Sequence, residues 1–343
     1  MPTSAPVAPT MARTSPPTAP PATPTSAPAP GTAIPVPTSA NGAPRFSDVS
    51  QRTPADVLRY LQGKLPDYPG SGPASSLNFS PSDILETMDT IVLDHVQQNR
   101  GDAALQQIYG VIARTILTTL QDVYPNQWIL VALDAGHGGK VGYFWDPGSE
   151  GTEATHTRAV VAALQRLVQT PDFGKIILRP IYNDSITDDF GLPANYNRKT
   201  VNQILMRQSR ASMLALEASA WNRAHAVASV AIHEISVHFN AGAGGALVLH
   251  EGDSVRPEFA ARSIEYGQRY LQRVVASLNA TGVLPTPLRL WGGNGLHDDA
   301  MMYRPDYISA PTFTGNITLR YGVLQGSGYL PRYIRLLLTP PVG

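Results

Sequence analysis

Two kinds of hydrophobic spacing divide this chain. Over residues 102–123 apolar residues recur every three or four positions, which is typical of an amphipathic helix. From Trp128 onward, short apolar runs alternate with longer stretches of helical spacing. We expect strands near 128–134, 175–179, 229–238, 245–250 and 332–338, and helices over 153–169, 199–228 and 257–278. This alternation predicts an α/β fold: a twisted, mainly parallel or mixed sheet with helices on both faces.

The part of the chain before this alternation reads as helical. Thr53 followed by Pro54 is typical of a helix start, because Thr caps the free N–H groups and Pro suits the first helical position. A second start is indicated by Ser80-Pro-Ser-Asp83, which resembles a capping box and precedes apolar residues at helical spacing up to His95. Together with the helix over 102–123, these signals predict a small helical region at residues 45–125.

Residues 1–44 consist almost entirely of Pro, Ala, Thr and Ser, with Arg13 as the single charged residue. Such a segment cannot bury enough apolar surface to offset the backbone entropy lost on ordering. We therefore expect a disordered Pro-rich tail at 1–44, the helical region at 45–125 and the sheet-containing domain at 126–343.

Composition excludes several classes of function. The 26 basic and 26 acidic residues cancel, so no basic field favours nucleic acid as a partner. The chain has no cysteine, which leaves His and carboxylate side chains as the available metal ligands. No apolar run reaches about 18 residues, so no membrane span is expected, and no signal peptide is visible.

Two segments place a histidine where a predicted strand ends. They are Val131-Ala-Leu-Asp-Ala-Gly-His-Gly-Gly139 and Ser236-Val-His-Phe-Asn-Ala241. A third segment, Asp146-Pro-Gly-Ser-Glu-Gly-Thr-Glu153, leads into a predicted helix. Taken singly, Glu153 also fits a helix-capping residue, and each histidine also fits a structural role. Two His and one Glu together would leave one tetrahedral position open on Zn²⁺, which is typical of a hydrolytic zinc site.

These three segments, in this order, resemble the zinc-dependent N-acetylmuramoyl-L-alanine amidases of the amidase 3 family, over about residues 126–338. The resemblance implies that His137, Glu153 and His238 bind zinc, with Glu150 as a rival for the middle ligand. It also implies that Asn240 holds the His238 loop or a substrate carbonyl.

The function implied by this resemblance is hydrolysis of the amide between N-acetylmuramic acid and L-alanine in peptidoglycan. Such a cell-wall hydrolase would work outside the cytoplasm, in the cell envelope or secreted. Residues 45–125 would then be available to bind a regulatory protein.

One part of the family pattern is not found where it is expected. Family members carry a catalytic Glu at the end of a late strand, in a Pro-x-Val-Leu-Val-Glu segment. The nearest match here is Pro331-Arg-Tyr-Ile-Arg-Leu336, which puts Leu336 at that position, and no Asp or Glu follows Asp306. Three acidic residues are weak substitutes: Glu251, Asp298 and Asp299. Two alternatives to the amidase therefore stay open, a catalytically impaired zinc-containing peptidoglycan-binding module and a zinc peptidase.

Overall fold

The computed structural model describes residues 42–53, 55–57, 82–136, 147–183, 196–225, 230–240, 245–250 and 257–298. Among these residues six strands form one mixed sheet in the order β3-β2-β4-β1-β5-β6. Strands β3, β2, β4 and β1 run parallel to their neighbours, whereas β5 is antiparallel to β1 and parallel to β6. The strands are β1 (Ser82–Asp89), β2 (Trp128–Ala135), β3 (Ile176–Pro180), β4 (Val230–Asn240), β5 (Leu247–His250) and β6 (Leu296–Asp298).

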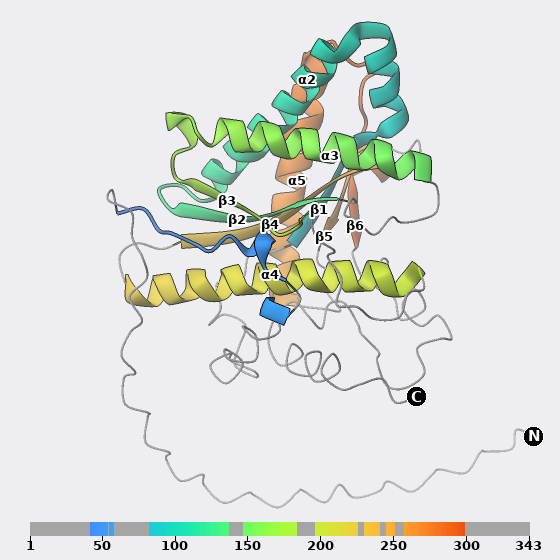
Figure 1. Cartoon of the computed structure of the whole chain (residues 1–343). Coiled ribbons are helices and arrows are strands. Elements are labelled where there is room, and N and C mark those ends of the chain that lie inside the picture. Colours follow the sequence, from blue (N-terminus) through green and yellow to red (C-terminus); the bar gives the residue numbers. More distant parts are fainter. Residues whose placement is uncertain are drawn as a thin grey trace, which may run out of the picture. The chain divides into compact units, whose positions relative to one another are not determined.

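Helices cover both faces of this sheet, which confirms the predicted α/β class (Figure 1). One face packs against α4 (Tyr196–Ala224), and the other against α2 (Thr90–Val123), α3 (Pro147–Leu167) and α5 (Pro257–Ala280). Three short 3-10 helices complete the described elements: η1 (Val49–Gln51), η4 (Pro171–Phe173) and η5 (Trp291–Gly293).

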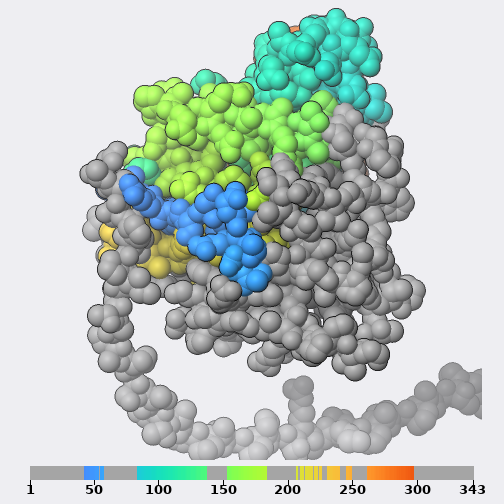
Figure 2. Space-filling view, in the orientation of Figure 1, coloured from blue at the N-terminus to red at the C-terminus, as the bar shows by residue number. Residues whose placement is uncertain are grey.

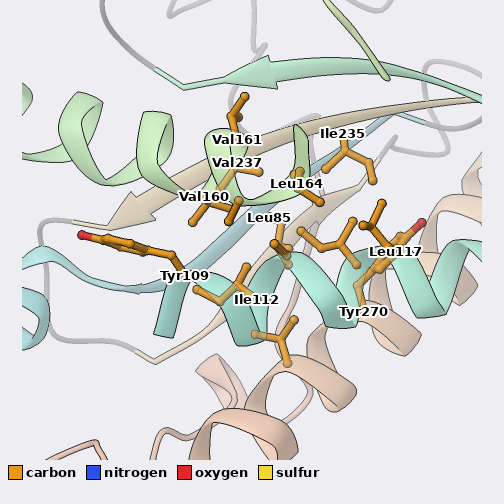
Figure 3. Close-up of a cluster of buried hydrophobic side chains, with 14 of the residues drawn as sticks. Leu85, Tyr109, Ile112, Leu117, Val160, Val161, Leu164, Ile235, Val237 and Tyr270 are labelled. Atoms are coloured by element: carbon orange, nitrogen blue, oxygen red, sulfur yellow. The ribbon is translucent and has the colours of Figure 1, made fainter. Parts of the chain in front are cut away.

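The alternation of side chains along the strands divides the core into two layers. Odd-numbered residues of β4, such as Ile235 and Val237, point into the larger layer, where Figure 3 shows them against Ile112 of α2 and Val160 of α3. Even-numbered residues such as Ile232 belong to the smaller layer, which packs against α4. Because successive side chains in a strand point to opposite faces, this parity decides which face each polar residue occupies.

Most of the predicted elements after Trp128 are confirmed. Strands β2, β3, β4 and β5 and helices α3, α4 and α5 each overlap the predicted ranges. The predicted strand over 332–338 lies outside the described residues, as does the tail at 1–41.

The predicted helix over residues 80–95 is wrong for its first half. Residues Ser82–Asp89 form β1, which pairs with β4 on one side and β5 on the other, and helix α2 begins only at Thr90. In β1 the polar residues Asp83 and Thr87 are buried whereas Ile84 is only half-buried, so the alternation of burial along the strand does not appear as an alternation of apolar and polar residues. Short apolar runs of this kind cannot be distinguished from helix by spacing alone.

The helix predicted over 102–123 is confirmed as the longer part of α2. Gly101 has a φ of 79°, and this left-handed residue separates it from the first part of the helix, Thr90 to Arg100. Leu105 and Leu120 of α2 lie in the same buried layer as Leu85 of β1 and Val131 of β2. Residues 82–123 are therefore part of the sheet and its core, and not a helical region apart from them.

The segment before β1 also packs against this core. Thr53 caps a helical turn as predicted, because its hydroxyl accepts from the Asp56 N–H at 3.2 Å while the Asp56 carboxylate accepts from the Thr53 N–H at 3.2 Å. Phe46 and Val49 belong to the layer under α4. Figure 2 shows this segment, in blue, at the surface beside the green α3 and β3 segment.

Candidate functional site

The two histidine-containing segments meet at the carboxyl ends of β2 and β4. These strands are parallel neighbours, and Asp134 is paired with Ser236 and Ala135 with Val237. The Ser236 hydroxyl donates to Asp134 Oδ2 at 2.9 Å, and the Gly136 N–H donates to the Val237 carbonyl at 2.8 Å. The first segment is therefore held against the second up to the residue before His137. His137 itself lies outside the described residues.

Gly136 allows the His238 ring to lie directly on the backbone of the first segment. A Cβ atom built at residue 136 would stand 2.4 Å from Cε1 and 2.5 Å from both ring nitrogens of His238, closer than real Cβ contacts come. Any side chain there would displace the imidazole. Glycine at this position is thus required for the close approach, which brings His238 next to the backbone that continues into His137.

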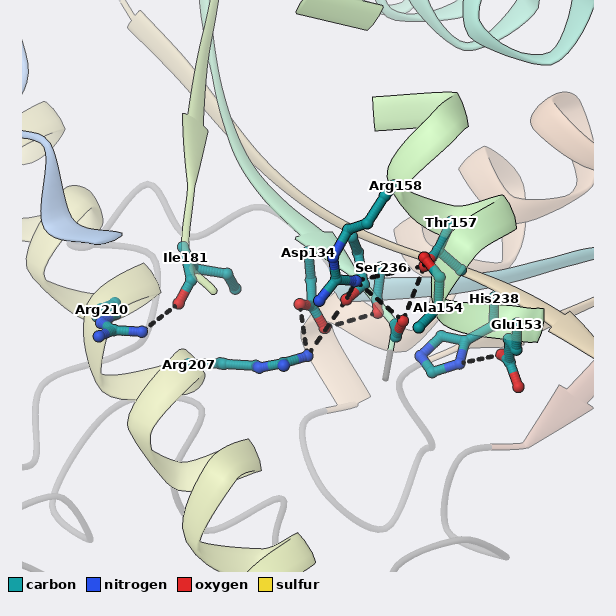
Figure 4. A network of polar contacts seen from close by, with 12 residues as sticks. Asp134, Glu153, Ala154, Thr157, Arg158, Ile181, Arg207, Arg210, Ser236 and His238 are labelled. Carbon is teal, nitrogen blue, oxygen red and sulfur yellow. Dashed lines mark hydrogen bonds and ion pairs between the residues drawn. The ribbon is translucent and has the colours of Figure 1, made fainter. Parts of the chain in front are cut away.

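Glu153 reaches this imidazole from the first part of α3. Its Oε1 atom lies 3.0 Å from His238 Nδ1 and also accepts from the Phe239 N–H at 3.0 Å (Figure 4). The helix is fastened to the end of β2 because the Thr157 hydroxyl donates to the Gly136 carbonyl at 2.9 Å. The fold therefore brings Glu153 into contact with His238, two of the residues that the sequence singled out as zinc ligands.

Negative charge surrounds the His238 ring. Burial by itself lowers the pKa of His238, but the hydrogen bond and charge of Glu153 outweigh it, with further contributions from Glu86 and Asp134. The net effect is a raised pKa for His238. Its side chain is 20% exposed and that of Glu153 13% exposed, so both are partly exposed. The three carboxylates therefore favour the protonated form of the imidazole.

Asp134 is held in its charged form by α4. Burial alone raises the pKa of Asp134, but the positive charge of Arg207 outweighs it, and His238, Ser236 and Arg158 add to the lowering. Arg207 donates to Asp134 Oδ1 at 2.8 Å, and both side chains are buried. The Asp134 carboxylate thus links β2 to Ser236 of β4 and to Arg207 of α4. These bonds fix the strand ends that carry the two segments.

The remaining predicted site residues fall into three groups. The side chains of Glu150, on α3, and Asn240, at the end of β4, are not described, and Glu251, Asp299 and Leu336 lie wholly outside the described residues. Asp298 ends β6, whose backbone is three strands from β4, or about 14 Å at the usual spacing between strands. Asp298 is paired with His250 of β5, and His250 is paired with Asp83 near the start of β1. The backbone of Asp298 is therefore near the end of the sheet opposite to the one where Glu86 is paired with His238.

The fold brings one further carboxylate to the site, that of Glu86. It lies on β1 and is paired with His238 in the parallel register of β1 and β4. Burial raises the pKa of Glu86; the charge of His238 opposes this rise, and the negative charge of Glu153 adds to it. A sequence signal was present, because Pro81-Ser-Asp-Ile-Leu-Glu86 has the same Pro-to-Glu spacing as the segment expected near the C-terminus.

Comparison of the chain with protein-family models, with curated proteins and with solved structures gave no match. Within the described residues, no group of three or more His, Cys, Asp or Glu side chains is placed to hold a metal ion. His137 is not among those residues. None of the described helices has the length and apolar character needed to cross a bilayer.

Proposed function

We propose that this protein is a zinc-dependent amidase that hydrolyses the bond between N-acetylmuramic acid and L-alanine in peptidoglycan. The single observation that carries the proposal is the contact of Glu153 with His238, whose ring rests on Gly136 immediately before His137. The three residues that the sequence singles out thus belong to segments that the fold brings to one place.

The donor atoms fit zinc. Imidazole nitrogen and carboxylate oxygen are both common zinc ligands, and two donors on one tetrahedral zinc lie about 3.4 Å apart. Glu153 Oε1 and His238 Nδ1 are 3.0 Å apart, which is close to this separation. His137, Glu153 and His238 would hold the ion. When bound, zinc supplies a Lewis acid that polarises a carbonyl and lowers the pKa of water.

The chain's own residues prepare this site by fixing its ligands. The Phe239 N–H holds the Glu153 carboxylate toward His238, and the Asp134–Ser236 bond locks the ends of β2 and β4 together. Outer hydrogen bonds of this kind orient metal ligands and typically contribute a factor of 10–100 to metal affinity. A site with three protein ligands keeps one position for substrate or water, which is the arrangement of hydrolytic zinc sites.

Glycan strands with stem peptides would be the substrate, and the protein would act outside the cytoplasm. A regulatory protein that binds before residue 125 would touch elements of the sheet itself, because β1 and α2 belong to the same core as β2 and β4. Such a partner would therefore affect the site through the core residues that β1 and α2 share with β2 and β4.

The test is metal content together with digestion of purified sacculi. The wild-type protein should contain one zinc ion per chain and release new amino termini at L-alanine, and a chelator should abolish this release. Glu153→Ala should lose both zinc and activity, whereas Glu265→Ala, on the exposed part of α5, should keep both.

Mass spectrometry of the released fragments separates the competing functions. Release of intact stem peptides that begin with L-alanine would support the amidase function. Cleavage within the stem peptide would show instead that the protein is a peptidase. Binding of sacculi by a zinc-loaded protein with no release of fragments would replace it with a silent binding module.

A further inference from the structure

The mixed sheet places Glu86 beside His238, although more than 150 residues separate them in the chain. In the parallel register of β1 and β4, Leu85 is paired with Val237 and Glu86 with His238. Paired residues of parallel neighbours lie about 4.8 Å apart, and their side chains project from the same face of the sheet. Leu85 and Val237 share the large core layer on one face, so Glu86 and His238 share the other.

The regular pairing of β1 with β4 ends at Glu86. The register with β4 shifts between Glu86 and Asp89, so that one extra residue stands on the β1 side before Asp89 is paired with Asn240. Bulges of this kind are common next to active sites, because they re-aim a side chain and end the regular pairing. Immediately beyond, Asp89 caps α2 by accepting from the Ile91 N–H at 2.8 Å. Glu86 is thus the last regularly paired residue of a strand held on both sides.

Glu86 is distinct from the pair formed by Glu153 and His238. Glu153 comes from α3 and contacts the ring through Nδ1, whereas Glu86 comes from the neighbouring strand and interacts with both through its charge. Its side chain is only partly buried. The described residues therefore provide one carboxylate in contact with the imidazole and a second, half-buried one on the neighbouring strand.

We propose that Glu86 is the catalytic residue that transfers the proton during amide hydrolysis, an inference that rests on the proposed function. The Glu86 carboxylate takes a proton from the attacking water as the new carbon–oxygen bond forms. It then delivers that proton to the leaving nitrogen as the carbon–nitrogen bond breaks, which gives a muramic acid carboxyl group and an L-alanine amine. The carboxyl group gives its own proton to the amine, so the products are a carboxylate and an ammonium group, and Glu86 returns to its starting charge.

This assignment changes which part of the chain is needed for activity. The carboxylate expected near Leu336 is supplied instead by β1, which lies before the first histidine segment in the chain and between β4 and β5 in the sheet. Residues 126–343 alone would lack it.

The first test is kinetic, on the full-length protein with sacculi as substrate. Glu86→Gln keeps the size of the side chain and removes its basicity, and it should lower kcat by about 10² to 10⁴, which is the usual contribution of a general acid or base. KM should stay within threefold and zinc content should stay at one per chain. Glu265→Gln, the same change on α5, should have no effect. A Glu86→Gln protein with kcat within threefold of wild type would overturn the assignment.

A second readout does not depend on turnover. A small hydroxamate chelates zinc as an anion and needs a nearby base to accept its proton, whereas azide binds zinc without releasing one. Acetohydroxamate should therefore bind zinc-loaded Glu86→Gln about 10- to 100-fold more weakly than wild type, with azide affinity unchanged. Equal hydroxamate affinity in both proteins would overturn the assignment.

The two readouts separate the failure of this inference from failure of the proposed function. A wild-type protein that does not cleave sacculi, but shows the hydroxamate difference, would refute the substrate and support the role of Glu86. A wild-type protein that cleaves sacculi, with Glu86→Gln equally active, would refute the role of Glu86 and leave the amidase in place.

Discussion

Strands β1 and β4 carry two carboxylate–imidazole clusters, one on each face of the sheet. On the α2 and α5 side, Asp83 Oδ2 lies 3.3 Å from His233 Nε2, and the two side chains are 1% and 0% exposed. On the other side, Glu86 and Glu153 surround His238, which is 20% exposed. The two clusters place carboxylate and imidazole side chains on the same two strands. They differ in their exposure to solvent and in the polar groups that surround them.

The Asp83–His233 cluster is sealed by polar groups of its own layer. The Ser263 hydroxyl donates to Asp83 Oδ1 at 2.6 Å, and the hydroxyl groups of Tyr270 and Tyr124 each lie 3.4 Å from a nitrogen of His233. Burial raises the pKa of Tyr270 well above its ordinary value, with smaller contributions from Tyr124 and Asp83. A carboxylate and an imidazole in contact therefore do not by themselves define a site; an open side at the strand ends is also needed.

The largest expected effect distinguishes the clusters by stability. Asp83→Ala should lower the free energy of unfolding by about 3 kcal/mol, because it leaves His233 and Ser263 buried without their partner. Zinc content should not change, because Asp83 lies on the face away from His238. Chemical denaturation and metal analysis measure the two quantities. Loss of zinc from a stably folded Asp83→Ala protein would contradict the division into a structural and a functional cluster.

The matched control for this change is Glu265→Ala. Glu265 pairs with Arg269 at the surface, where both side chains are about half exposed. Exposed pairs of this kind contribute about 0.2–1 kcal/mol, so the free energy of unfolding should change by no more than that.

A smaller effect is expected for the ion pair beneath the site. Arg207→Met should cost about 2 kcal/mol at pH 7, because Asp134 would then be buried without its main charge partner. The wild-type pKa of Asp134 is lowered, so the stability it contributes is present above the unfolded pKa of about 3.8 and is lost as the pH falls through the folded pKa.

The difference in unfolding free energy between wild type and Arg207→Met should therefore be largest near pH 7 and shrink at acid pH. Denaturation curves between pH 7 and pH 3 measure it. A difference that grows as the pH falls would contradict the assignment of Asp134 as a charged partner of Arg207.

The smallest expected change in stability concerns Gly136. Gly136→Ala should cost about 1 kcal/mol through overpacking, and it should weaken zinc binding by about tenfold because the His238 ring must move away from the new methyl group. Gly110→Ala is the control: a Cβ there meets no other atom within 4 Å, and alanine favours helix α2. If Gly136→Ala left the zinc affinity unchanged, the His238 ring would not be part of the zinc site.

The sequence predicted more of the site than of its surroundings. The apolar runs that end at Asp134 and before His238 predicted two strand ends with a histidine at each, and parallel pairing then brings such ends to one edge of the sheet. Strand β1 was not predicted, because polar Asp83 and Thr87 lie on its buried face and hide the apolar–polar alternation that marks a strand. The family pattern therefore points to the position of Leu336, and nothing in the local spacing points to Glu86.

The pairing of β1 with β4 could not be read from local patterns. Hydrophobic spacing reports the type of an element, whereas neighbours in a sheet are set by how the whole core packs. Leu85 packs with Val131 and Ile235 in one layer, and this packing places β1 between β4 and β5. Local patterns therefore do not predict that Glu86 is paired with His238.

The most direct test of the zinc site is a crystal structure of the zinc-loaded protein, with anomalous scattering measured at the zinc edge. We expect one strong zinc peak about 2.0–2.2 Å from a nitrogen of His137, a nitrogen of His238 and an oxygen of Glu153, with the Glu86 carboxylate nearby and not coordinated. A peak that lacks either histidine, or no bound zinc in an active protein, would contradict it.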